Sequence, residues 1–139
     1  MDLLKEYGDA TKGFRAYIDR DGDILHATLW GFWSRDDGVA WKDTLAKGHG
    51  ELKATGRPWH WYMNVTDYPS QSDLVQDVYR ECMEDANEAG LTKTAFVVSA
   101  RVLPRMQADR LSSEGGLNKQ FFDSEAQALS WLKEATVAA

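Results

Sequence analysis

The sequence predicts one α/β domain over residues 1–139, in which helices pack on a mostly parallel five-stranded sheet with an antiparallel first strand. The length fits one domain, because domains cluster at about 100–150 residues. Apolar and polar side chains alternate from Phe14 to Asp19, and a period of two indicates a strand. Strand-like and helix-like segments then alternate, which favours right-handed crossovers and parallel pairing. The predicted order is β-β-α-β-α-β-α-β-α, with a core over about residues 14–133 and short flexible ends.

The first two strands are predicted to form a hairpin. Asp21-Gly22 lies between two apolar runs, and this dipeptide is a strong hairpin signal. The partner strand runs from Ile24 to Trp30 and is antiparallel to the first. It is mostly apolar on both faces, as expected of a strand that is covered on two sides.

A helix and a third strand follow the hairpin. Ser34 can cap the helix, and Asp36 and Asp37 stand where the helix dipole favours negative charge. The segment from Gly48 to Pro58 is rich in glycine and is predicted as a loop. Trp59 to Thr66 is predicted as the third strand.

The second helix has the clearest pattern in the chain. Ser72 can cap its start, and Gly90 suits a left-handed residue just past its end. Apolar side chains recur at helical spacing along one face, namely Val75, Val78, Tyr79, Cys82, Met83 and Ala86.

The remaining segments complete the alternation. Thr94 to Ala100 is a short apolar run that is typical of a buried parallel strand. A third helix is predicted from Pro104 to Leu111 and ends at Gly115-Gly116, before a fifth strand from Lys119 to Phe122. Ser124 is expected to cap a last helix that runs to about residue 135.

The composition argues against several classes of function. Sixteen Lys and Arg against 22 Asp and Glu give a net charge of −6, and we expect no nucleic-acid partner without a basic stripe. A lone cysteine cannot form a disulfide framework and suits a reducing compartment. No apolar run reaches about 18 residues and no signal-peptide layout is visible, so no integral membrane segment and a cytoplasmic location are expected. No metal or cofactor is predicted, because the histidines and the cysteine lack metal-site spacing.

Five of the six tryptophans fall within residues 30–61, on two strands and one helix that should pack together: Trp30, Trp33, Trp41, Trp59 and Trp61. A large aromatic core is the favoured interpretation, since each ring buries about 150–250 Å². A ligand pocket lined by these rings and a dimer interface that uses exposed rings are the alternatives.

Three segments, taken in order, resemble a known fold. They are the hairpin Tyr17–Gly31 with Trp41 on the helix beyond it, the strand ending Asn64–Asp67, and the closing segment Phe121–Leu132. Together they resemble the STAS (anti-sigma-factor antagonist) fold, and more narrowly the SpoIIAA-like group of small bacterial proteins. The resemblance spans about residues 14–133.

The resemblance implies a non-catalytic module that binds partner proteins. Some STAS domains are switched by phosphorylation of a serine in the loop after the third strand, and Ser70 and Ser72 are the hydroxyls near that place here. The loop lacks the Asp-Ser-Ser-Gly-like cluster that is typical of the switch. The SpoIIAA-like group is also similar in topology to the CRAL-TRIO lipid-binding fold, which implies a small apolar ligand as another partner.

The leading hypothesis is therefore a STAS-like binding or regulatory module without catalytic activity. Ligand sites of open parallel sheets lie beyond the carboxyl ends of the strands, so a small apolar ligand or a protein partner is expected to bind the strand-end loops. The candidate binding residues are Trp33, Trp41, Asp67, Tyr68, Ser70 and Arg101. A homodimer is a further candidate assembly.

The rival hypothesis is an enzyme that uses Asp67 with His60 or His26 as acid–base groups. It would require these side chains to converge in one cleft. Strand alternation directs His60 and Asp67 to opposite faces of the sheet, which counts against it. Hydrogen-bonded structural histidines are the favoured interpretation.

Overall fold

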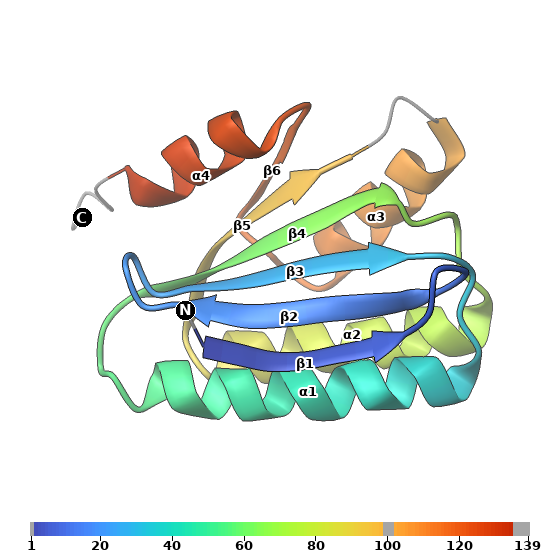
Figure 1. The fold of residues 1–139 in the computed structure, drawn as a ribbon. Coiled ribbons are helices and arrows are strands. Elements are labelled where there is room, and N and C mark those ends of the chain that lie inside the picture. The colour runs from blue at the N-terminus through green and yellow to red at the C-terminus, as the bar shows by residue number, and fades with distance from the viewer. Residues whose placement is uncertain (1, 99–101, 135–139) are drawn as a thin grey trace.

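The computed structural model describes residues 2–98 and 102–134, and its six strands form one sheet in chain order (Figure 1). β1 to β3 pair antiparallel, and β3 to β6 pair in parallel. The strands are β1 Asp2–Gly8, β2 Gly13–Asp19, β3 Ile24–Trp30, β4 Trp59–Asp67, β5 Leu91–Val97 and β6 Lys119–Phe122. The helices are α1 Arg35–Lys53, α2 Asp73–Glu88, α3 Val102–Glu114 and α4 Glu125–Lys133.

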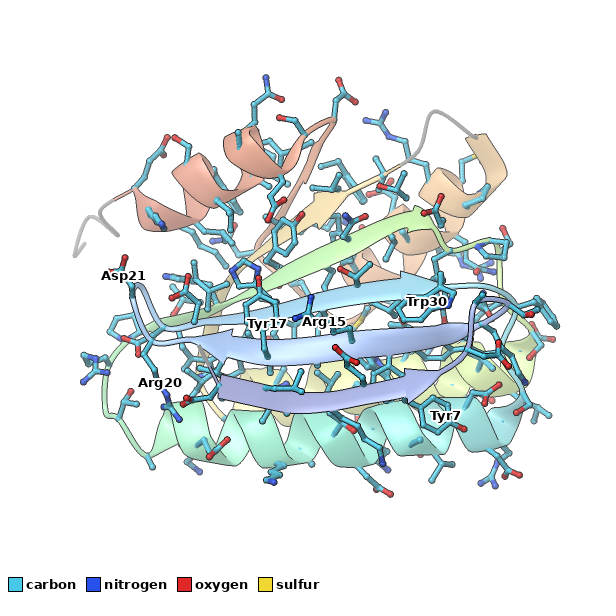
Figure 2. All side chains as sticks on the ribbon, viewed as in Figure 1. Tyr7, Arg15, Tyr17, Arg20, Asp21 and Trp30 are labelled. Atoms are coloured by element: carbon cyan, nitrogen blue, oxygen red, sulfur yellow. The ribbon has the colours of Figure 1, made fainter. Side chains whose placement is uncertain are left out.

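Helices pack on both faces of the sheet, which confirms the predicted α/β class (Figure 1). On one face α1 contacts β1 and β2, α2 contacts β5 and lies along α1, and α3 packs on α2. On the other face α4 lies against β4, β5 and β6. The side chains of Arg15 and Tyr17 project from β2 on this second face, away from α1 and α2 (Figure 2).

The sequence prediction missed β1, the sixth strand of the sheet. The expectation of a short flexible N-terminal end is wrong for Asp2–Gly8, which pair with β2. Leu4 and Tyr7 are the β1 side chains that pack on the core, and they stand three residues apart. A β-bulge between Leu3 and Lys5 accounts for this spacing, because an extra residue breaks the period of two by which strands are recognised.

The predicted loop from Gly48 to Pro58 is wrong in its first half, because α1 continues to Lys53. Gly48 is buried inside the helix, and a Cβ there would lie 2.7 Å from Leu25 Cδ1 and 2.8 Å from Leu4 Cδ1. The absence of a side chain at Gly48 therefore allows the helix to pack closely on the sheet. Packing against the sheet overrides the weak helix propensity of glycine at this position.

Most other boundaries agree with the sequence. Ser34, Ser72 and Ser124 cap α1, α2 and α4, each through a side-chain oxygen that accepts from a backbone N–H in the first turn. The hairpin turn holds Gly22 and Asp23 at positive φ. β5 begins three residues earlier than predicted, at Leu91, and the predicted strand end at residues 99–100 lies outside the described residues.

The larger core lies between the sheet and α1 and α2, and it contains four of the five clustered tryptophans. Trp33, Trp41, Trp59 and Trp61 are each at most 2% exposed. Trp33 and Trp41 pack edge to face with ring centroids 5.9 Å apart, a favoured aromatic arrangement. Trp30 is half-buried outside this core and donates its indole N–H to the carbonyl of Asp9 at 2.7 Å. A smaller core under α4 contains Ile24, Tyr62, Ala95, Val97, Ala128 and Leu132.

The carboxylate of Asp37 joins three parts of the chain at the start of α1. It accepts from the Tyr7 hydroxyl at 2.8 Å and from Lys12 Nζ at 2.6 Å. It also accepts from the backbone N–H of Ser34 at 2.8 Å, which completes a capping box. Burial raises the pKa of Asp37, but the donors outweigh burial and lower it to about 2. Tyr7 is seen beside the N-terminal end of α1 in Figure 2.

Gly48 and Gly50, two of the glycines of α1, provide a test of the close approach. An alanine Cβ at Gly50 would meet nothing within 4 Å. We expect Gly50→Ala to raise the free energy of unfolding by about 0.5–1 kcal/mol through helix propensity. Gly48→Ala should be less stable than Gly50→Ala by about 1–3 kcal/mol, because Leu4 and Leu25 must shift. Urea denaturation of both variants measures this difference, and equal stabilisation would contradict the packing role of Gly48.

Candidate functional site

A pocket opens at the carboxyl ends of β4 and β5, between α2 and α3. Its volume is about 50 Å³, and it is lined mainly by apolar side chains. These are Val65, Tyr68, Pro69, Tyr79, Met83, Phe96, Val98, Pro104, Ala108 and Leu111, with Gln71, Gln76, Arg105 and Gln107 as the other lining residues. The pocket lies at the end of the sheet where the sequence predicts a ligand site.

The predicted binding residues lie at different depths around this pocket. Tyr68 lines it, and Trp33 packs edge to face on Tyr68 with ring centroids 4.9 Å apart. Trp41 lies deeper, beside a separate void of about 10 Å³ that Trp61 also lines. A void of this size holds at most about one water molecule, so the tryptophans form a packed core.

The polar candidates stand outside the pocket. Asp67 is exposed, and its carbonyl accepts from the backbone N–H of Gly31 at 3.2 Å. Ser70 is half-buried, and Ser72 is occupied as the cap of α2. Arg101 lies outside the described residues.

Gln71 holds the loops at this end together, and sequence reasoning missed it. Its side-chain oxygen accepts from the backbone N–H of Trp33 at 2.8 Å. Its amide nitrogen donates to the carbonyls of Gly31 at 3.1 Å and Pro69 at 2.7 Å. One buried amide thus joins the loop after β3 to the loop after β4, where backbone groups would otherwise be unpaired.

Two further glutamines attach the helices to this loop. Gln107 of α3 accepts from the backbone N–H of Gln71 at 2.7 Å and donates to its carbonyl at 3.2 Å. Gln76 of α2 donates to the same carbonyl at 2.9 Å and accepts from Arg110. All three glutamine amides therefore have partners at both their oxygen and their nitrogen.

Two tyrosine hydroxyls in the lining have no such partner. The hydroxyl groups of Tyr68 and Tyr79 are buried, and neither makes a hydrogen bond of acceptable geometry within the described part of the chain. The rings lie 6.1 Å apart between centroids. The contact between the two hydroxyls raises the pKa of Tyr68 and lowers that of Tyr79. Burial is the main cause that raises the pKa of both phenols, so both remain neutral donors. The sequence pattern assigned Tyr79 to the core face of α2. Its hydroxyl was the signal in the sequence that a polar group would be buried there.

His49 has a structural arrangement in the larger core. Its Nδ1 is 2.6 Å from Asp85 Oδ2, and its Nε2 accepts from the indole N–H of Trp61 at 3.0 Å. Because Nε2 accepts a hydrogen bond from Trp61, the neutral ring carries its proton on Nδ1, and this N–H donates a hydrogen bond to Asp85. Burial lowers the pKa of His49, and the carboxylate of Asp85 opposes this without reversing it.

The residues of the rival enzyme hypothesis do not converge. His60 lies at the start of β4 and Asp67 at its end, which places them about 23 Å apart along an extended strand. His26 lies on the face of the sheet that carries α4, with its Nδ1 3.0 Å from the Tyr17 hydroxyl. His26 and His60 are both buried, and burial lowers the pKa of each.

Two searches of the described ranges, 2–98 and 102–134, concern other kinds of site. No group of three or more His, Cys, Asp or Glu side chains is arranged to hold a metal ion within them. None of the helices in the same ranges combines the length and apolar character needed to cross a bilayer.

Two solved structures share this architecture. One is the crystal structure of an uncharacterized protein of the DUF3478 family with a SpoIIAA-like fold from Shewanella loihica PV-4, with 16% identity, coverage of 91% of this chain and 98% of that chain, and a TM-score of 0.68. The other is the NMR structure of the protein TM1081, with 13% identity, coverage of 94% and 96%, and a TM-score of 0.57. No protein-family model and no curated protein matches the sequence. The chain has a SpoIIAA-like fold, as the resemblance predicted.

The unpartnered hydroxyls predict an unusual response to substitution. We expect Tyr68→Phe and Tyr79→Phe to leave the free energy of unfolding unchanged or to raise it, because each removes a buried polar group that lacks a partner. Tyr7→Phe is the matched control, because it removes a hydroxyl that donates to Asp37 and should cost about 1–2 kcal/mol. A comparable loss in all three variants, measured by urea denaturation, would show that Tyr68 and Tyr79 have partners.

The buried histidines predict a loss of stability in mild acid. A folded-state pKa below the unfolded value of about 6.5 means that the unfolded chain binds more protons as the pH falls, so stability decreases. The slope between pH 7.5 and 5.5 should reach at most about 1.4 kcal/mol per pH unit for each such histidine. His49→Gln should reduce this slope, although it also lowers stability at pH 7.5. An unchanged slope in urea titrations of the variant would rule out His49 as a contributor.

Proposed function

We propose that this chain is a non-catalytic SpoIIAA-like binding module that takes a small apolar ligand into the pocket between α2 and α3. The observation that carries the proposal is the combination of an apolar lining, a position at the carboxyl ends of β4 and β5, and buried hydroxyls without partners. Small-molecule sites are typically concave and apolar with a few polar groups that fix orientation.

Ligand entry requires α3 to move outward. A volume of about 50 Å³ holds only a few water molecules, so the pocket as it stands is too small for an organic ligand. Among the described contacts of α3 are polar ones, the paired amides of Gln71 and Gln107 and the ion pair of Arg80 with Glu114 at 3.0 Å. Each such contact contributes about 0.5–1.5 kcal/mol, so a bound ligand can offset the loss of several.

A protein partner that covers the same end is the second candidate. Phe32, Leu74 and Met106 are 59%, 58% and 61% exposed. The bonds from Gln71 to Gly31 and Gln107 bring the chain neighbours Phe32 and Met106 to one end of the molecule. Exposed apolar side chains gathered at one end of a molecule favour a docking surface. Substitution of Phe32 and Met106 by Ser should abolish partner docking yet leave ligand binding unchanged, which separates the two candidates.

A filled pocket provides the test of ligand binding. The probe is 2-ethylnaphthalene, an apolar aromatic molecule whose binding is followed by isothermal titration calorimetry. Ala108 of α3 lines the pocket, so Ala108→Trp should fill it and weaken binding at least about tenfold, or about 1.4 kcal/mol. Ala126→Trp adds the same side chain at an exposed position of α4 and should leave binding unchanged. Absence of binding to the native chain, or equal binding by both variants, would refute the proposal.

A further inference from the structure

Resting on the proposed function, we infer that the ligand is uncharged and carries a hydrogen-bond acceptor, such as a ketone, ester or ether oxygen, that the hydroxyls of Tyr68 and Tyr79 bind. The polar groups of the lining that still lack a partner define the chemical class of the ligand.

At least one of the two tyrosine O–H groups has no hydrogen-bond acceptor. Each phenol has one O–H to donate. If one hydroxyl donates to the other after a small rotation, the second O–H still lacks an acceptor, because no other acceptor in the described residues lies in bonding geometry. Tyr68 is only 8% exposed, so water outside the protein does not satisfy this group. An acceptor on a ligand would remove this cost.

The other polar groups of the lining are already paired. Gln71 uses its oxygen for Trp33 and its nitrogen for Gly31 and Pro69. Gln76 and Gln107 are paired in the same way with the loop and with Arg110. Polar recognition of a ligand therefore falls to the two tyrosines.

The charge of the lining argues against an ionic ligand. Arg105 is the cation of the lining residues described above, and it is exposed at the rim with its guanidinium 5.7 Å from the centroid of the Phe121 ring. None of the described lining residues places a counter-ion beside Tyr68, and burial of an unpaired carboxylate or ammonium group is strongly unfavourable. A neutral acceptor avoids this penalty.

The shape of the interior favours a flat apolar body behind the acceptor. Val65, Tyr79, Met83 and Phe96 line both the pocket and the inner void beside Trp41 and Trp61. Met83 is unbranched and adaptable, so its displacement would join the two spaces. The aromatic rings of Tyr79 and Phe96 then provide walls for a planar ring.

A pair of nearly isosteric probes tests the inference. In 2-acetylnaphthalene a carbonyl replaces the methylene group of 2-ethylnaphthalene. The ratio of the two dissociation constants in the native chain is compared with the ratio in the double variant Tyr68→Phe/Tyr79→Phe. We expect the relative preference for the ketone to fall about tenfold in the double variant, since an unpaired buried hydroxyl typically changes binding by this order. The carbonyl infrared band should shift to lower frequency only in the native complex.

The controls separate this inference from the proposed function. Tyr17→Phe removes a hydroxyl on the opposite face of the sheet and should leave the ratio unchanged. If neither probe binds the native chain, the proposed function fails. If both probes bind and the ratio is equal in the native chain and the double variant, the acceptor inference fails while the proposed function stands. Circular dichroism verifies that the double variant is folded.

Discussion

The side chain of Gln71 is the interaction on which the pocket end of the molecule depends. β3 and β4 diverge after their last backbone link, from Gly31 to Asp67, and the loops beyond have no ladder to join them. The amide of Gln71 supplies the missing pairs, and its own backbone binds Gln107 of α3. A single residue thereby sets the distance between two loops and a helix. The position of the pocket follows from that geometry.

Rigidity and adaptability are divided between the two halves of the larger core. On the side of α1, tryptophan rings pack edge to face and the Asp37 carboxylate fixes the helix start against β1. Dense aromatic packing of this kind transmits strain and resists deformation. On the side of α3, Leu111 is buried in the core, and the described polar attachments include the amides of Gln71 and Gln107 and the Arg80–Glu114 ion pair. Structural change on binding is therefore expected at α3 and not at α1.

Local sequence signals were sufficient for most elements and insufficient where tertiary contacts decide. The serine caps at Ser34, Ser72 and Ser124 are short-range devices, and the structure has all three. β1 was missed because its bulge breaks the strand period. The C-terminal part of α1, from Gly48 to Lys53, was missed because packing against the sheet, and not helix propensity, decides the place of Gly48. Tyr68 could be placed near a site from the strand-end rule. Gln71 could not, because its partners Trp33 and Gly31 lie far away in the chain.

The order of the sheet has a consequence for how the molecule is completed. Each strand pairs with its neighbour in the chain, so the sheet can grow at one edge while the polypeptide is synthesised, with no strand inserted between two others. The four tryptophans of the larger core lie within residues 33–61, so they are synthesised before α3. A nascent chain that ends after β5 presents the future pocket as an open apolar groove, and α3 is the segment that closes it.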